Sequence, residues 1–187
     1  MFLHDSMCGK INNTLLSKEM VNVEKVWAPT LPDVLYQIEN MEENADVIAI
    51  HSMTNDLNQR NVGEITDLVA DVSEKALLKA KKIVISSIIS RDDDPLLNAK
   101  AAAVNANLKL IFINTPNVSL CINDNLNDKK FRVDKVHLSD RGVSRLANNL
   151  KYKLASALNI TVKKKSRIDN HWDFRNGQRY EEDRFRY

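Results

Sequence analysis

The sequence predicts an α/β protein, a three-layer α/β/α sandwich around a doubly wound parallel sheet of about five strands. Short apolar, β-branched runs alternate with amphipathic stretches along residues 1–158. Such alternation is typical of a parallel sheet that carries helices on both faces. Two of the runs, residues 46–50 and 82–89, are short and largely apolar, as strands buried on both faces are.

Five strands are expected from these runs, at residues 1–4, 21–27, 46–50, 82–89 and 108–113. Between them, apolar residues recur three and four positions apart, which is the spacing of a helix with one buried face. This spacing predicts helices at residues 12–20, from Pro32 to Met41, at 62–77, from Asp94 to Leu108 and from Ser139 to Leu158.

The helix starts have recognisable end signals. Pro32 and Pro95 suit a first helical turn because proline fixes φ, and Asp94 and Ser139 are residue types that cap a helix N-terminus. Residues 114–136 are polar and form a long connection between the last strand and the last helix. Loops of this length in compact domains are often functional.

Composition excludes several classes of protein. The 187 residues carry a net charge of +2, contain only two cysteines and include no apolar run of the ~18 residues that a membrane span needs. A collagen, a coiled coil, a membrane protein and a disulfide-rich secreted domain are therefore excluded. The first residues lack the features of a signal peptide, and we expect a cytoplasmic protein with reduced thiols.

The end of the chain differs from the rest. Residues 159–187 are expected to form an extension, and its part from 163 carries eight Lys/Arg, five Asp/Glu and five of the eleven aromatic residues. Interleaved basic and aromatic side chains could bind nucleic acid by stacking on bases. The alternative is a loosely docked extension without such a role.

Polar side chains lie next to three of the predicted elements. Ser6 comes directly after the first strand, Asn55 after the third, and Asp134 and His137 lie just before the last helix. Since ligands of parallel sheets bind beyond the carboxyl ends of the strands, these residues are candidates for one site. Ser6 could serve as nucleophile, His137 as base and Asp134 as the carboxylate that orients it. The N–H of Ser6 and the amide of Asn55 could stabilise an oxyanion.

Other interpretations of the same residues stay open. Each motif alone also fits a turn or a helix cap, as Asn55-Asp56 does. His4, His51 and His137 could together suggest a metal site. Cys8 could replace Ser6 as nucleophile, although a small apolar packing role suits it better. The three histidines can be explained without a metal, so we expect no metal ion. A glycine fingerprint for dinucleotides is lacking, and we expect no cofactor.

Four segments carry a resemblance to a known family. They read HDSM (4–7), WAPTLPD (27–33), MTND (53–56) and DKVHLSDRG (134–142). In this order they resemble the four motif blocks of the SGNH, or GDSL-type, hydrolases. The longer stretches SSIISRDDDPLLNAKAAAVNANLK and DKVHLSDRGVSRLANNLKYKL closely resemble the esterase-like domains in the first open reading frames of animal non-LTR retrotransposons. The resemblance covers residues 1–158.

The resemblance implies a flavodoxin-like fold with strand order 2-1-3-4-5 and a serine esterase that hydrolyses small-molecule or lipid esters. It assigns Ser6 as nucleophile, His137 as general base and Asp134 as its partner. The oxyanion donors that it implies are Ser6, Ala28 and Asn55.

Three departures from the family pattern bear on activity. His4, Ala28 and Met53 stand where the motif blocks have glycine. Glycine permits positive φ and close approach of a ligand to the backbone, so we expect His4 to add bulk beside Ser6 and Met53 to crowd the oxyanion pocket. Two functions follow: a weakened esterase, or a catalytically degenerate module of a retroelement protein that acts in binding or assembly.

Overall fold

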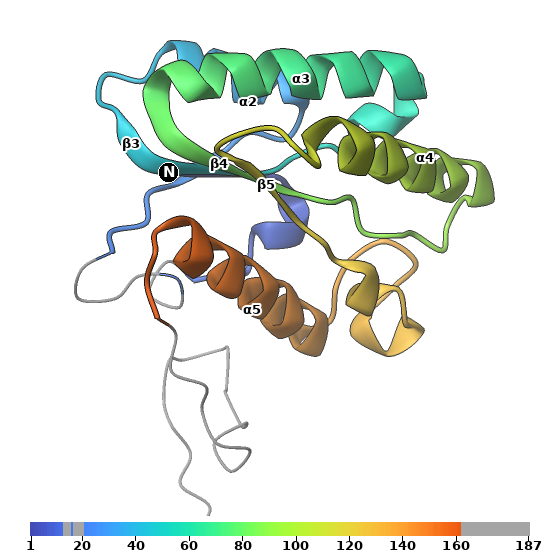
Figure 1. The fold of residues 1–187 in the computed structure, drawn as a ribbon. Helices are drawn as coiled ribbons and strands as arrows, with labels where there is room; N and C mark the ends of the chain where they lie inside the picture. Colours follow the sequence, from blue (N-terminus) through green and yellow to red (C-terminus); the bar gives the residue numbers. More distant parts are fainter. Residues whose placement is uncertain (13–15, 17–20, 162–187) are drawn as a thin grey trace, which may run out of the picture.

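A computed structural model describes residues 1–12, 16 and 21–161 of the chain. Its centre is a parallel sheet of five strands in the order β2-β1-β3-β4-β5 (Figure 1). The strands are β1 (Phe2–His4), β2 (Lys25–Trp27), β3 (Ala45–His51), β4 (Ala80–Ser86) and β5 (Val118–Cys121). Every pairing is parallel. The predicted fold class and strand order are confirmed.

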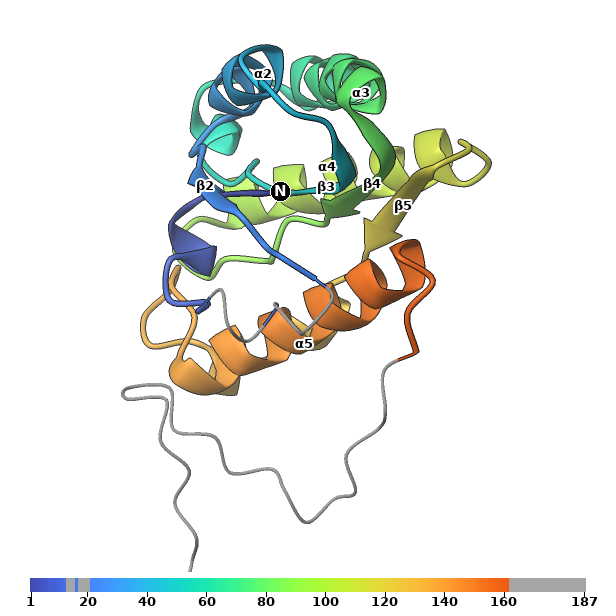
Figure 2. The same ribbon diagram turned by 90° about the vertical axis from the view of Figure 1, so that its left-hand side faces the viewer.

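Helices cover both faces of the sheet and complete the three layers. They are α2 (Leu31–Glu39), α3 (Val62–Lys79), α4 (Pro95–Phe112) and α5 (Asp140–Ala157). Helix α5 lies on the opposite side of the sheet from α2 and α3 (Figure 2). The core on one face contains buried side chains from α2, α3 and α4, and the core on the other contains side chains from α5. Among the described residues, no helix is long and apolar enough to cross a membrane.

Side-chain caps explain where the helices begin. Asp94 accepts hydrogen bonds from the N–H groups of Leu96 and Leu97, and Ser139 accepts one from Gly142. These two caps are the ones that the sequence predicts. Thr30 and Asp33 form a capping box at the start of α2, which satisfies N–H groups that have no partner inside the helix.

The strand predicted at residues 108–113 is wrong. Helix α4 continues to Phe112, and the last strand is Val118–Cys121, inside the predicted connection. Val104, Leu108 and Phe112 are buried four residues apart, whereas Leu110 between them is 74% exposed. That burial follows the helical period, so this apolar run forms the last turns of a helix.

Two predictions fall on parts of the chain outside the description. Most of the helix predicted at residues 12–20 lies there, and so do residues 162–187 of the basic extension. The other predicted strands and helices are present with shifted ends; β2, for example, is limited to Lys25–Trp27.

Candidate active site

Ser6 lies on a short turn at the carboxyl end of strand β1, between β2 and β3 in the sheet. Asp5 caps this 3₁₀ turn, Ser6–Cys8, by accepting the N–H of Met7 at 3.0 Å. Met7 and Cys8 are buried, while Ser6 is exposed. The cap thus anchors the turn in the protein and leaves the serine accessible.

A lysine from the neighbouring strand fixes the other end of this turn. The Nζ of Lys25 donates hydrogen bonds to the carbonyls of Gly9 and Ile11, both at 2.9 Å. The Ser6 turn is therefore held by its own cap and by β2.

Asp134 and His137 are brought together in the loop before α5. The Nδ1 of His137 hydrogen-bonds to Oδ2 of Asp134 at 2.8 Å. The other carboxylate oxygen accepts the N–H groups of Val136 and His137, both at 2.6 Å. These bonds lower the pKa of Asp134 to about 2, the backbone N–H of His137 contributing most. The carboxylate is thus ionised at neutral pH and holds Nδ1, which leaves Nε2 for another partner.

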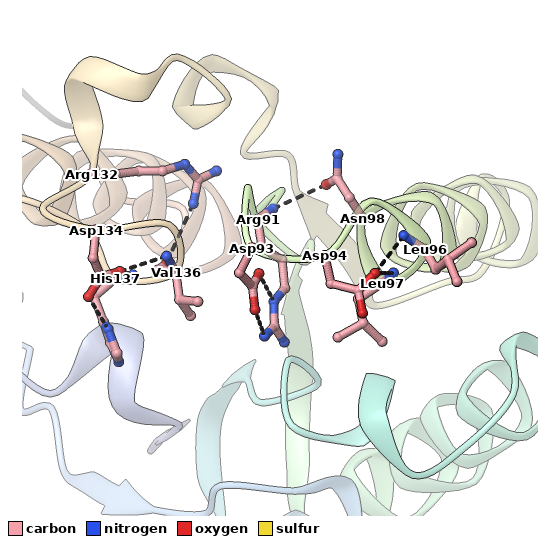
Figure 3. A network of polar contacts seen from close by, with 10 residues as sticks. All are labelled: Arg91, Asp93, Asp94, Leu96, Leu97, Asn98, Arg132, Asp134, Val136 and His137. Atoms are coloured by element: carbon pink, nitrogen blue, oxygen red, sulfur yellow. Dashed lines mark hydrogen bonds and ion pairs between the residues drawn. The ribbon is translucent and has the colours of Figure 1, made fainter.

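One ion pair links the N-terminal segment to the start of α5. Lys10, which follows the Ser6 turn, pairs with Asp140 at 3.6 Å. In the view of Figure 3, the His137 ring is directed toward the ribbon of the N-terminal turn. Both side chains of the Asp134–His137 pair are about half exposed. Within the described residues, no hydrogen bond joins Ser6 to His137. Such bonds are often long before substrate binds.

A glycine allows the Asp134–His137 loop to pack closely on α5. A Cβ on Gly142 would lie 2.2 Å from the Phe131 carbonyl oxygen and 3.1 Å from side-chain carbons of Leu138. Any other residue there would push the loop off the first turn of the helix.

Asn55 belongs to a frame of hydrogen bonds at the ends of β2 and β3. Its Nδ2 donates to the Pro29 carbonyl at 3.0 Å, and Ser52 Oγ donates to the Ala28 carbonyl. Asp56 accepts the N–H of Leu31 at 3.0 Å. Burial raises the pKa of Asp56, although the Leu31 N–H and Arg60 oppose this. The frame ties residues 52–56 to residues 28–31.

The oxyanion donors expected here differ in availability. Ala28 is buried, and its N–H donates to the His4 carbonyl at 3.0 Å, which continues the pairing of β1 with β2. Asn55 is exposed and uses its amide for one bond, to Pro29, while such an amide has two donor hydrogens. The N–H of Ser6 has no partner among the described residues. Ser6 and Asn55 therefore offer free donors, and Ala28 does not.

The residues at the family's glycine positions are buried. His4 donates from Nδ1 to the Asp5 carbonyl at 2.8 Å and packs edge-on against Trp27. Burial lowers its pKa. Met53 is only 2% exposed and belongs to the core on the α2–α3–α4 face. The bulk expected at the oxyanion pocket is thus a core side chain.

The remaining candidates have other roles. His51 is buried and pairs through Nδ1 with Ser86 Oγ at 2.8 Å. Cys8 and Cys121 are buried, and burial raises their thiol pKa values, to about 11 for Cys121. A raised pKa suppresses the nucleophilic thiolate, so Cys8 packs as an apolar residue. Across the residues that the structure describes, no cluster of three His, Cys, Asp or Glu side chains could hold a metal ion.

Sequence reasoning missed a buried polar network below the site. Asn123 donates from Nδ2 to Ser86 Oγ and to the Ser87 carbonyl, both at 2.9 Å, and its N–H donates to Ser87 Oγ. Together with His51, it joins the ends of β3, β4 and β5. Two adjacent serines inside an apolar strand were the signal, because buried hydroxyls need partners.

Comparisons with known proteins point to one fold. No family model and no curated protein matches this sequence. A solved lipolytic protein of the G-D-S-L family from Veillonella parvula is 19% identical, with TM-score 0.65, covering 79% of this chain and 93% of that one. A GDSL-like lipase from Bacteroides thetaiotaomicron is 14% identical, with TM-score 0.69 and coverages of 83% and 87%. A carbohydrate esterase family 3 protein from Talaromyces cellulolyticus is 15% identical, with TM-score 0.64 and coverages of 86% and 98%. This chain therefore has the α/β fold of the GDSL-type, or SGNH, hydrolases.

Proposed function

We propose that the chain is a serine esterase that hydrolyses acyl or acetyl esters of small molecules or lipids. The observation that carries this proposal is the hydrogen bond from His137 Nδ1 to Asp134, in a loop that leads into α5. The start of α5 is linked to the segment after the exposed Ser6 turn by the Lys10–Asp140 ion pair. The fold supports the proposal, because solved esterases share the same sheet and layers. Residues 1–158 would form the hydrolase-like domain, acting in the cytoplasm, and residues 159–187 an extension.

The reaction follows from the roles that these three residues can take. Ser6 Oγ attacks the ester carbonyl carbon while His137 Nε2 accepts the hydroxyl proton. Asp134 keeps the other imidazole proton on Nδ1 and stabilises the imidazolium. The tetrahedral intermediate collapses, the C–O bond to the alcohol breaks, and His137 protonates the leaving alcohol. Water, deprotonated by His137, then hydrolyses the acyl-serine and releases the acid.

The oxyanion donors set the expected rate. The N–H of Ser6 and the second amide hydrogen of Asn55 can point at the developing charge, whereas the N–H of Ala28 is used in the sheet. Losing one such donor costs an acyl-transfer enzyme about 10²–10³ in rate. We therefore expect slow turnover of activated esters.

The engaged Ala28 N–H also favours a second candidate function. In this alternative the chain is a catalytically degenerate SGNH-fold module of a retroelement protein, which acts in binding or assembly. The basic and aromatic residues 163–187 would then contact nucleic acid.

Two measurements test the esterase function. One is labelling with a serine-reactive fluorophosphonate, and the other is the burst of p-nitrophenol released from p-nitrophenyl acetate. Wild type and Cys8→Ser should be labelled, and Ser6→Ala should not be. Ser6→Ala should also keep the wild-type melting temperature, because Ser6 is exposed.

Labelling that survives in Ser6→Ala would refute the nucleophile. A wild type that neither labels nor shows a burst would favour the binding module. RNA binding that weakens steeply with salt and disappears when residues 163–187 are removed would support that module.

A further inference from the structure

Arg132 lies two residues before Asp134, and its guanidinium is enclosed between two loops. Its side chain is 2% exposed. Nη2 donates to both the hydroxyl of Ser90, at 2.8 Å, and the Ser90 carbonyl, and Nη1 approaches the Val136 carbonyl at 3.5 Å. Nε lies 3.6 Å from a carboxylate oxygen of Asp92. The guanidinium thus links the loop after β4 to the loop that carries the catalytic pair.

The backbone of this second loop closes on itself. Arg132 and Leu138 form an isolated antiparallel bridge, and the N–H of Val133 donates to the His137 carbonyl at 3.0 Å. We call residues 132–138 the dyad turn. Its tip is joined to the loop after β4 by the N–H of Asp92, which donates to the Lys135 carbonyl at 2.8 Å. Arg132 therefore sits at the base of a closed turn, and Asp92 contacts its tip.

We propose that Arg132 is a positioning residue: it holds the dyad turn, with Asp134 and His137, against the loop after β4 (Figure 3) and thereby keeps the His137 imidazole in place for a reaction at Ser6. This inference rests on the proposed esterase function. A guanidinium suits the task because its planar donors reach several acceptors at fixed angles, which a lysine ammonium does not.

The burial of Arg132 argues against a role in stability alone. Desolvation lowers its pKa, which Asp92, Asp134 and Asp93 oppose. A buried charge network is often no more stabilising than apolar side chains of the same volume. An enclosed arginine with acceptors on both loops is therefore better explained by the geometry that it imposes on the turn.

The same loop provides a matched control. Arg91 has a side chain that is 10% exposed and pairs with Asp93, from Nε at 2.8 Å and from Nη2 at 2.5 Å. Its backbone N–H donates to Asn98. These bonds stay within the loop and the start of α4, so Arg91→Met removes a comparable arginine without touching the dyad turn.

The test compares Arg132→Met, Arg132→Lys, Ser90→Ala and Arg91→Met. We measure kcat and KM for p-nitrophenyl acetate, the rate of phosphonate inactivation, and hydrogen exchange at the Val133 and Asp92 amides. A misplacement of about 1 Å can cost 10²-fold in rate. We expect Arg132→Met to lower kcat and the inactivation rate about 10- to 100-fold with little change in KM. Both amides should exchange faster.

The other variants should lower kcat by smaller factors than Arg132→Met does. Arg132→Lys should recover only part of kcat, Ser90→Ala should lose a few-fold, and Arg91→Met should stay within twofold of wild type. Should Arg132→Met fail to fold, Ser90→Ala removes a single acceptor and decides the question.

Two results would overturn the positioning role. One is unchanged exchange at Val133 and Asp92 in the Arg132 and Ser90 variants, and the other is an equal loss of kcat in Arg91→Met. A wild type that does not react with the phosphonate would instead refute the esterase function, and the exchange measurement would still decide how Arg132 acts on the turn.

Discussion

Two histidines near the carboxyl edge of the sheet have opposite surroundings. His51 ends β3, is 2% exposed, and pairs with the neutral hydroxyl of Ser86. His137 precedes α5, is about half exposed, and pairs with the carboxylate of Asp134. Burial lowers the pKa of His51, which favours its neutral imidazole in the folded protein.

The difference shows what makes a histidine suited to general-base catalysis. A base must reach substrate and must be stabilised when it becomes charged. A partner carboxylate stabilises an imidazolium, whereas a serine hydroxyl in a buried network does so far less. His137 meets both requirements, and His51 meets neither. The comparison therefore supports His137, and not His51, as the base of the proposed esterase.

Replacing each histidine by alanine should give opposite results, and this is the largest effect expected. His137→Ala should lower esterase turnover about 10⁴- to 10⁶-fold, as loss of a triad base does, with little change in stability. His51→Ala should cost about 2–4 kcal/mol of unfolding free energy, because it leaves a cavity and an unpaired buried hydroxyl. Urea unfolding and ester hydrolysis measure both. Loss of turnover in a fully stable His51→Ala would reverse the assignment.

The two partners of these histidines extend the comparison. Asp134→Asn should lower kcat about 10²- to 10⁴-fold, because an amide favours the wrong imidazole tautomer. Ser86→Ala should leave kcat unchanged and lower stability by about 1–3 kcal/mol. The folded pKa of Asp134 lies below its ordinary value of 3.8. Its interaction with His137 is therefore fully present above about pH 4 and is lost only as the pH falls to about 2.

A carbon-detected NMR titration of Asp134 checks this point. The carboxyl signal should titrate near pH 2 in wild type. It should move only part of the way toward 3.8 in His137→Ala, because the backbone N–H groups of residues 136 and 137 still donate to the carboxylate. A midpoint that is the same in both would mean that the His137 imidazole does not hold the carboxylate.

Substitutions at two of the family's glycine positions test whether Ala28 and Met53 affect the reaction rate or the stability of the fold. Ala28→Gly should raise the rate up to about tenfold, because glycine lets the backbone N–H turn away from the His4 carbonyl. Met53→Gly should instead cost about 3 kcal/mol or more, since it removes a buried side chain. Thermal unfolding measures the loss of stability, and steady-state kinetics measures the change in rate. A stable Met53→Gly with a raised rate would place the Met53 side chain in the pocket after all.

The smallest effect is the acid sensitivity that His51 gives to the fold. Its folded pKa lies below the ordinary 6.5, so the unfolded chain binds the proton first. The contribution to stability is present above pH 6.5 and falls as the pH drops toward the folded value, by at most about 1.4 kcal/mol per pH unit. Urea unfolding between pH 5 and 8 gives the unfolding free energy at each pH. This free energy should depend less steeply on pH in His51→Asn than in wild type. An equal pH dependence in the two proteins would mean that other groups cause the acid sensitivity.

Local patterns were enough for most of the fold and for one contact of the site. The runs at 46–50 and 82–89 marked β3 and β4, and an aspartate three residues before a histidine marked the Asp134–His137 pair. The run at 108–113 was ambiguous, because a short apolar run fits a strand or a buried helix turn. Its place on α4 is decided by packing against the sheet, which no local pattern contains.

The features that could not be predicted from the sequence depend on tertiary contacts. Arg132 contacts Ser90, which lies 42 residues away in the chain, and His51 contacts Ser86, 35 residues away. The engaged N–H of Ala28 depends on the pairing of β1 with β2. Such partners follow from which loops the fold brings together.

The two braced pairs of loops also suggest how this scaffold could be re-engineered. Residues 28–31 are tied to 52–56, and residues 90–92 to the dyad turn, each pair by its own hydrogen bonds. We therefore expect that each pair must be exchanged as one unit, a cassette, between proteins of this fold. Grafting a glycine-containing first cassette while keeping the second would change the oxyanion donors without disturbing the base, whereas grafting a single loop would break its brace.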